Sequence, residues 1–285
     1  MNKIFLTGAT GFIGSYIADE LCKIGYDILA AKRQSSSMKN CAFFVDKVQW
    51  INTDIQGWEE EVVEFTPECI IHSAWIGVQA KDRDNKVLQE KNFSLFQSIL
   101  NIAKVSKTKK IIAFGSQAEY GYLNSVVSEE KECLPQFAYG KTKLQVMNML
   151  KTFAEQNNVK WYWLRVFSVR GEREGQNWLL PSFEHKLKDP EQKEMDFTLG
   201  EQCYSYLSCE TLAWWVSKIV KKIDGKSGIY NFSAQGAKPI RQILTQIRDS
   251  QRPDFKLNFG ALPTRKGQST IIEGKMDKFF SEFIN

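Results

Sequence analysis

The first 165 residues alternate short apolar runs with longer amphipathic segments, and this alternation constrains the fold more than any other feature. The runs read KIFLTG, YDILAAKR, VQWINTD, CIIHSAW, KKIIAFGS and WYWLRVF. Between them, apolar residues recur at helical spacing, as at Ile17, Leu21 and Ile24. Strands that alternate with helices are typical of a parallel sheet, and nearly continuous apolar strands fit a sheet covered on both faces. The pattern predicts an α/β fold with a doubly wound parallel sheet.

The rhythm changes after residue 166. The stretch GEREGQNWLLPSFEHKLKDPEQKE is polar and irregular, and the remainder reads as strand, helix, strand, helix and strand. We interpret this part as a smaller C-terminal substrate lobe interleaved with the end of the first domain. The predicted larger domain comprises 1–168 and about 198–224, and the predicted smaller lobe comprises about 169–197 and 225–285.

Composition narrows the classes of partner. The chain has 285 residues, of which 43% are hydrophobic and 25% charged, so it can bury a substantial core without disulfide or metal staples. The net charge of +5, from 38 basic and 33 acidic residues, favours small anionic ligands over nucleic acid. No apolar run approaches the roughly 18 residues that a membrane helix needs. We therefore expect neither a nucleic-acid nor a membrane partner.

The number and spacing of the cysteines and histidines indicate whether the chain can bind a metal and in which cellular compartment it lies. The six cysteines are scattered without a C-x-x-C pair, and only two histidines are present, so the sequence offers no metal-ligand cluster. Free thiols favour a reducing compartment. The stretch NKIFLTG enters an apolar strand at once and lacks the pattern of a targeting segment. These features predict a cytoplasmic protein that binds no metal.

Three glycines, Gly8, Gly11 and Gly14, lie between the first predicted strand and the first predicted helix, in TGATGFIGSYIADEL. Glycines at such a turn let the backbone approach a pyrophosphate, and the helix N-terminus presents N–H donors to the anion. The alternative is a tight turn that simply needs a positive φ. The position between strand and helix favours a dinucleotide site.

The spacing G-x-x-G-x-x-G in TGATGFIG resembles the short-chain dehydrogenase/reductase superfamily, in its extended branch of nucleotide-sugar epimerases, dehydratases and reductases. The resemblance covers essentially the whole chain, with the first 165 residues most specific. It implies a Rossmann-type sheet and a nicotinamide cofactor. The cofactor contacts that it implies are Gly8, Thr10, Gly11, Phe12, Ile13, Gly14, Asp54, Ile55, Ala74, Asn92, Tyr139, Lys143 and Val166.

The end of the second predicted strand indicates which nicotinamide cofactor binds. An acidic residue there accepts hydrogen bonds from the ribose of NAD, whereas a cation accommodates the 2′-phosphate of NADP. The expected acid position holds Lys32, and Arg33 follows it. Two cations suit a dianionic phosphate, although Lys and Arg also occur at solvated strand ends. Together with the glycine turn, they predict NADPH or NADP rather than NAD.

Tyr139 and Lys143 stand four residues apart in FAYGKTKLQVMNMLKTFAEQ, which has a helical pattern. Residues at this spacing share one face of a helix. A nearby ammonium favours the phenolate and lowers the pKa of a tyrosine from its usual ~10, which suits general acid/base chemistry on a carbinol or ketone. The alternative to this chemistry is that a half-buried tyrosine simply lies beside a solvated lysine.

Ser116 ends the apolar strand of KKIIAFGSQAEYG and supports the catalytic interpretation. This segment resembles the S-S-x-x-V-Y-G of the same family, with Gly115 in place of the first serine and Glu119 in place of the valine. The resemblance implies a Ser-Tyr-Lys site made of Ser116, Tyr139 and Lys143. The serine hydroxyl would stabilise the substrate oxygen as charge shifts onto it.

Three chemistries share this scaffold. The Asp-Glu pair typical of 4,6-dehydratases is replaced here by Gln117 and Ala118, which disfavours dehydration. An epimerase typically retains NAD and has an acid where Lys32 stands, although NADP-using epimerases exist. A ketoreductase needs NADPH and the triad alone. GSQAEYG, NWLLPS and FGALPTRKGQ resemble 4-ketoreductases of the CDP-abequose and CDP-paratose synthase type.

The substrate implied is a nucleotide-diphosphate sugar with a C4 ketone. Ser168 and Arg170 replace the asparagine and tyrosine of the family's L-R-x-F-N-x-Y-G segment, and a usual arginine is absent from Tyr204-Ser205-Tyr206. Arg265 is then the candidate for the diphosphate, because guanidinium groups match phosphate oxygens; a lone surface arginine is the alternative. The candidate substrate contacts are Ser116, Gln117, Ser168, Asn177, Trp178 and Arg265.

Two further expectations follow from the resemblance. Some proteins of this fold bind the nucleotide without turnover, but these typically lack the tyrosine or the lysine, and this chain has both. The resemblance also implies a homodimer in which helices around 92–105 and 141–153 pair with their symmetry mates as a four-helix bundle.

Overall fold

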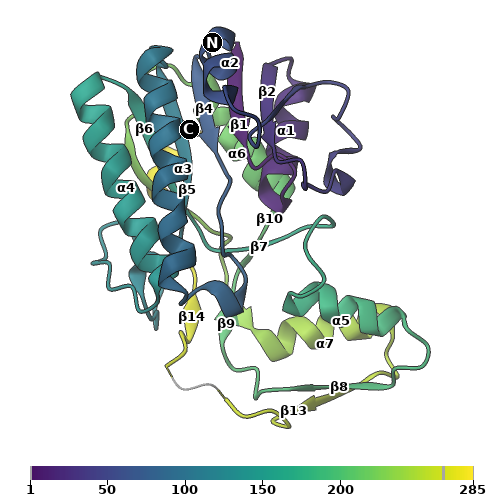
Figure 1. The fold of residues 1–285 in the computed structure, drawn as a ribbon. Helices are drawn as coiled ribbons and strands as arrows, with labels where there is room; N and C mark the ends of the chain where they lie inside the picture. Colours follow the sequence, from purple (N-terminus) through teal and green to yellow (C-terminus); the bar gives the residue numbers. More distant parts are fainter. Residues whose placement is uncertain (1, 265–266, 285) are drawn as a thin grey trace.

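Seven parallel strands form the central sheet of this computed structural model, which describes residues 2–264 and 267–284. Their order is β11-β6-β5-β4-β1-β2-β3 (Figure 1). The strands are β1 (Lys3–Thr7), β2 (Asp27–Lys32), β3 (Gln49–Asn52), β4 (Cys69–His72), β5 (Lys110–Ser116), β6 (Lys160–Val166) and β11 (Gly228–Phe232). The strand order reverses between β1 and β4, which is where open α/β sheets bind ligands at their carboxyl ends. The predicted α/β fold is confirmed.

Helices cover both faces of the sheet. One face packs against α1 (Phe12–Lys23), α6 (Cys209–Lys221) and α8 (Asp277–Phe283). The other packs against α2 (Trp58–Phe65), α3 (Lys86–Val105) and α4 (Ala138–Asn157). Successive side chains of a strand point to opposite faces, so Ile4 and Leu6 of β1 join the first core while Phe5 joins the second. This is why the strands are apolar along their whole length.

A third hydrophobic cluster lies outside the sheet, between α5 (Leu179–Lys188) and α7 (Ile240–Gln251). These helices lie beside the parallel pair β8 (Glu194–Phe197) and β13 (Lys256–Phe259), in the lower part of Figure 1. Short pairings connect this region to the sheet: β7 (Ser168–Arg170) with β10 (Tyr206–Ser208), and β9 (Cys203–Tyr204) with β12 (Lys238–Pro239) and β14 (Ile271–Ile272). The remaining elements are the short helices η1 (Lys39–Cys41), η2 (Ala80–Asp82) and η3 (Gln117–Tyr120).

Two segments lie elsewhere than the predicted lobe boundary places them. Residues 228–232, expected in the smaller lobe, form β11 and pair with β6 at the edge of the central sheet. Helix α8 packs its Phe279 and Phe283 into the same core as α1 and α6. The predicted division already returns the chain to the sheet once, with about 198–224; in the structure that return extends to β11, and α8 returns to the sheet a second time. The functional assignment of the two lobes stays a prediction.

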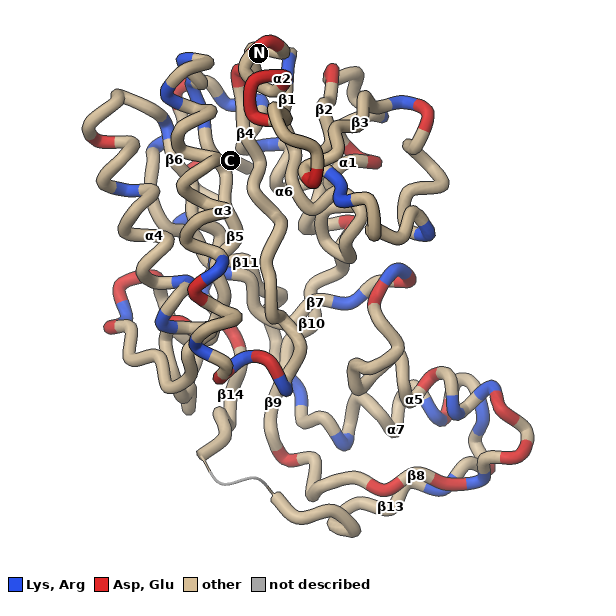
Figure 2. The backbone as a smooth tube through the Cα atoms, viewed as in Figure 1, with Lys and Arg blue, Asp and Glu red and all other residues tan. Residues whose placement is uncertain are grey.

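Charge is distributed over the molecule without obvious segregation. Figure 2 shows Lys and Arg interspersed with Asp and Glu along most of the backbone, including α5 and the strands β8 and β13. Among the described residues, no helix combines the length and the apolar character that crossing a membrane requires.

Candidate active site

The glycine turn lies between β1 and α1, at the carboxyl end of the sheet. Gly8 has a φ of +77°, and a Cβ on Gly14 would collide with the Gly8 carbonyl, so helix and strand approach closely only with glycine at both positions. Gly11 is the N-cap of α1, which has no side-chain cap and no acidic residue in its first turn. The first N–H groups of α1 are therefore open to an anion. The turn, which also contains Thr10, Phe12 and Ile13, fits the pyrophosphate of a dinucleotide.

The two predicted NADP-binding cations lie at the carboxyl end of β2. Lys32 is half-buried, with its Nζ 5.8 Å from the centroid of the Trp50 ring, and Arg33 is exposed. Within the described part of the chain, neither side chain forms an ion pair with a carboxylate. Both cations are thus available to a phosphate group beside the glycine turn.

Two of the cofactor contacts that the family resemblance implies, Asp54 and Ile55, follow β3. Asp54 accepts a hydrogen bond from the backbone N–H of Gln34 (2.8 Å), and its side chain thereby holds the end of β2 in place. Ile55 is 57% exposed, which leaves an apolar surface for a ring to cover. The structure thus places this pair next to the two cations of β2.

Three other predicted cofactor contacts lie along the same edge of the sheet. Asn92 of α3 is buried, and its amide both accepts from and donates to the backbone of Ile76 (2.8 and 3.1 Å), so it fixes the loop after β4. In that loop the backbone N–H of Ala74 donates to Thr7 Oγ1 (3.3 Å). Val166 ends β6 and is paired with Ser116 at the end of β5.

Ser116 and Tyr139 come together at the carboxyl end of β5. Ser116 is the N-cap of η3, where its Oγ accepts from the backbone N–H of Ala118 (3.2 Å). Tyr139 is buried in the first turn of α4. Burial raises the pKa of Tyr139, while the charge of Arg83 and a hydrogen bond with the Ser116 side chain act in the opposite direction. The phenol therefore keeps its proton at neutral pH, and the net direction is opposite to the lowered pKa that the sequence predicted from Lys143, because burial outweighs the nearby positive charge.

Lys143 lies one turn further along α4 and is also buried. Its Nζ donates to the carbonyl of Phe114 (2.6 Å) and lies 3.5 Å from the centroid of the Trp75 ring. The same nitrogen is 5.8 Å from the Tyr139 ring centroid. Burial lowers the pKa of Lys143 to about 7, against the opposing effect of the Glu119 carboxylate. The lysine therefore changes charge within the physiological range.

Arg83, in the loop after β4, is a neighbour of this site that the sequence did not indicate. Its guanidinium carbon lies 5.2 Å from the Tyr139 ring centroid and 5.6 Å from that of Trp178. Its backbone carbonyl accepts from the N–H of Tyr139 (2.8 Å), and its Nε donates to the carbonyl of Val78 (3.0 Å). No sequence pattern marks an arginine in a polar loop as a neighbour of a helix more than fifty residues later.

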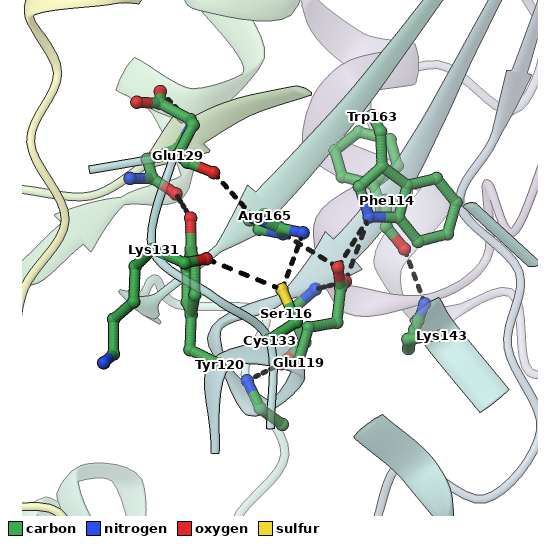
Figure 3. A network of polar contacts seen from close by, with 12 residues as sticks. Phe114, Ser116, Glu119, Tyr120, Glu129, Lys131, Cys133, Lys143, Trp163 and Arg165 are labelled. Carbon is green, nitrogen blue, oxygen red and sulfur yellow. Dashed lines mark hydrogen bonds and ion pairs between the residues drawn. The ribbon is translucent and has the colours of Figure 1, made fainter. Parts of the chain in front are cut away.

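A buried ion pair lies behind Ser116, as Figure 3 shows. Glu119 and Arg165 have side chains that are 0% and 2% exposed, and Arg165 Nε donates to Glu119 Oε2 at 2.8 Å. Arg165 also donates to Cys133 Sγ (3.0 Å), and its guanidinium lies 4.5 Å from the Tyr120 ring centroid. The family-like YG segment is thus anchored to β6 by charge as well as by packing.

The predicted substrate contacts are more dispersed. Gln117 follows Ser116 in η3, whereas Ser168 lies in β7 and pairs with Tyr206 of β10. Asn177 and Trp178 precede α5, where Trp178 is 38% exposed and contacts Arg83. Arg265 lies outside the described residues, so its proposed contact with the diphosphate stays a prediction.

One pocket of about 250 Å³ lies between β7, α5 and the start of α6. Glu172, Glu174, Glu184 and Glu210 contribute to its lining, and burial raises the pKa of Glu174 to about 7. Its arginine, Arg170, is paired with Glu184 (3.3 Å). An acidic lining disfavours an anionic diphosphate, and we do not assign this pocket to the substrate.

The sheet, the glycine turn and the polar groups at its carboxyl edge define an NAD(P)-dependent oxidoreductase of the short-chain dehydrogenase/reductase class. The chain belongs to the NAD dependent epimerase/dehydratase family, whose sequence profile matches residues 4–232. The family resemblance inferred from TGATGFIG and GSQAEYG is confirmed.

Two relatives that align with nearly the whole chain have names that refer to nucleotide-linked sugars. The chain is 24% identical to the dTDP-6-deoxy-L-talose 4-dehydrogenase (NAD(+)) of Aggregatibacter actinomycetemcomitans, over 95% of this chain and 99% of that protein. It is 25% identical to the CDP-abequose synthase of Salmonella muenchen, over 98% and 90%. Both alignments extend over nearly the whole length of this chain and of the relative.

Solved structures share the fold. The UDP-N-acetylglucosamine 4-epimerase of Methanobrevibacter ruminantium, in complex with UDP-N-acetylmuramic acid, has a TM-score of 0.87 at 20% identity and covers 100% of this chain and 92% of its own. The UDP-glucose 4-epimerase of Brucella ovis, in complex with NAD, has a TM-score of 0.84 at 19% identity, covering 99% and 92%. At these identities the likeness establishes the fold alone.

Proposed function

We propose that this enzyme reduces the C4 ketone of a nucleotide-diphosphate 4-keto-6-deoxyhexose, or of the related dideoxyhexose, with NADPH. The observation that carries the proposal is the convergence of Ser116, Tyr139 and Lys143 at the same carboxyl edge of the sheet as the glycine turn. A phenol, a hydroxyl and an ammonium at one point suit the addition of hydride and a proton to a ketone. The CDP-abequose synthase relative is aligned with 98% of this chain, which supports the same class of substrate.

Each of the three side chains has a separate task in this proposal. NADPH, when bound, supplies the hydride to C4. Tyr139 transfers its phenolic proton to the oxygen, which completes the alcohol, and Ser116 donates a hydrogen bond to that oxygen as it gains charge. Lys143, one helical turn away, holds the cofactor ribose and favours the tyrosinate that remains after transfer. Solvent then returns the proton to Tyr139.

The protonation state of Tyr139 favours reduction as the working direction. A buried phenol that keeps its proton at neutral pH acts as an acid toward an alkoxide, whereas oxidation would require the phenolate first. Dehydration is disfavoured because Gln117 and Ala118 stand where dehydratases have an acidic pair. The free cations Lys32 and Arg33 support NADPH over NAD, although one relative is named for NAD(+).

The test is a set of enzymatically prepared CDP-, dTDP-, GDP- and UDP-4-keto-6-deoxyhexoses incubated with NADPH, with absorbance at 340 nm and product NMR. We expect stoichiometric NADPH oxidation with at least one of them. Tyr139→Phe is expected to bind NADPH as the wild type does and to lose ~10²–10⁴-fold in kcat, the usual contribution of a general acid.

Other outcomes would identify the alternatives. Exchange of the C4 configuration without net NADPH oxidation would make the protein an epimerase. Tight NADPH binding without turnover on any of the sugars would make it a non-catalytic nucleotide-binding protein. Full activity of Tyr139→Phe would contradict the role given to that residue.

A further inference from the structure

Two departures from the family motif, Gly115 and Glu119, are coupled in space. A Cβ on Gly115 would collide with Trp163 Nε1 and with Glu119 Oε1. Both of those atoms belong to side chains that are buried and hydrogen-bonded to each other. The missing side chain at residue 115 therefore makes the room that the carboxylate of Glu119 occupies, beside Ser116 (Figure 3).

Every partner of the Glu119 carboxylate is a hydrogen-bond donor. Oε1 accepts from the backbone N–H of Ser116 (2.8 Å) and from Trp163 Nε1 (3.0 Å). Oε2 accepts from Arg165 Nε (2.8 Å) and from the same indole (3.1 Å). The ion pair with Arg165 and each of these donors favour the charged form of a carboxylate. Glu119 is therefore a fixed negative charge next to the backbone of Ser116.

This charge faces Lys143 across the Trp163 indole, since Lys143 Nζ lies 6.0 Å from the Trp163 ring centroid. The titratable and charged groups around Lys143 come from several elements. They are Tyr139 on α4, Glu119 on η3, Arg165 on β6, His72 on β4 and Arg83 in the loop after β4.

Only one of these five neighbours brings a negative charge to Lys143 at neutral pH. Tyr139 is protonated, and burial lowers the pKa of His72 to about 3, so that imidazole is neutral. Arg165 and Arg83 are cations, and Arg165 lies on the far side of Glu119 from the indole in Figure 3. Loss of the Glu119 charge would leave Lys143 buried among neutral groups and cations.

We propose that Glu119, given room by Gly115, is a positioning residue that fixes the backbone of Ser116 and keeps Lys143 in its ammonium form near neutral pH. The catalytic use of that ammonium rests on the reduction proposed above. The electrostatic link between Glu119 and Lys143 exists in the free protein and can be measured without a substrate.

The experiment follows the lysine side chains by NMR in protein labelled with ¹³C at lysine Cε. The Lys143 signal is assigned by its loss in Lys143→Met, and its titration is compared between the wild type and Glu119→Gln. The glutamine has the shape of glutamate without its charge. We expect the Lys143 midpoint to move to lower pH by roughly one unit in Glu119→Gln, as loss of a nearby opposite charge produces.

A matched control removes a different carboxylate of the same region. Glu129 accepts from the backbone N–H of Asn231 (2.8 Å), away from Lys143. Glu129→Gln is expected to leave the Lys143 midpoint in place. Coincident Lys143 titrations in the wild type and Glu119→Gln would overturn the proposal, as would an equal shift in both glutamine variants.

Two further measurements separate the possible failures. Gly115→Ala displaces the Glu119 carboxylate while residue 119 remains a glutamate. We expect this variant to move the midpoint of the Lys143 titration in the same direction as Glu119→Gln. It therefore tests the proposal if Glu119→Gln does not fold. With an active substrate, the fall of kcat/KM at rising pH should move to lower pH in Glu119→Gln. A wild type without turnover would contradict the proposed function, while the NMR titration would still decide the link between Glu119 and Lys143.

Discussion

Lys143 is buried, and burial disfavours its charged form. Its ammonium lies between the Trp75 ring and the carbonyl of Phe114, which both stabilise a cation. Burial lowers its pKa to about 7, so the ammonium is present below that pH and is lost above it. If the reduction needs the ammonium, kcat/KM should fall about tenfold for each pH unit above the pKa. Wild-type kcat/KM measured from pH 5.5 to 9 tests this.

Lys143→Arg is the informative companion, because an arginine does not lose its proton in this range. We expect this variant to have a lower kcat/KM that no longer falls above about pH 7. A wild-type profile that stays flat up to pH 9 would show that the protonation of Lys143 does not matter for turnover.

Arg83 is the second residue whose charge bears on the chemistry. Its guanidinium lies near the rings of both Tyr139 and Trp178, and its charge favours the phenolate of Tyr139. We expect Arg83→Met to reduce kcat, because loss of the guanidinium charge raises the pKa of Tyr139 further and makes it a weaker acid; the loss should be smaller than the ~10²–10⁴-fold that removal of a general acid costs, with unchanged NADPH binding. Lys81→Met, which removes an exposed charge from the same loop, serves as the control. Equal kcat values for the two variants would contradict this role.

At the scale of elements, we predict that the carboxyl end of β2 selects NADPH over NADH. Lys32 and Arg33 stand there beside the glycine turn, and Asp54 holds the backbone that follows them. Replacing Lys32 by Asp and Arg33 by Asn should weaken NADPH binding far more than NADH binding, because only NADPH loses phosphate partners. Fluorescence titration of both cofactors with both proteins measures this. Equal affinity of the wild type for NADH and NADPH would contradict the assignment.

At the scale of the whole molecule, we predict a homodimer. The predicted segments 92–105 and 141–153 lie within α3 and α4, which pack against each other over one face of the sheet. Pairing with a second copy would build a four-helix bundle. Sedimentation velocity at micromolar concentration is expected to give a species of twice the 32.8 kDa chain mass. A single species of monomer mass would contradict the prediction.

How much of the structure the sequence predicts depends on how far apart in the chain the interacting residues lie. Apolar periodicity is local, so the order of strands and helices up to β6 was predictable, as was the shared helix face of Tyr139 and Lys143. The pairing of Glu119 with Arg165 joins residues 46 positions apart, and a departure from a motif does not reveal its partner. The same limit applies to β11, because the residues of this strand do not reveal that it pairs with β6 at the edge of the central sheet.

In the proposed reaction, hydride from NADPH reaches C4 of the sugar while Tyr139 supplies the proton. The most direct measurement uses NADPH carrying deuterium at the transferred position, one 4-keto sugar nucleotide that is turned over, and ¹H and ²H NMR of the product. We expect one deuterium at C4 for each NADPH oxidised, and none above background with Tyr139→Phe over the same time. A product with altered C4 configuration, no deuterium and no NADPH consumed would contradict it.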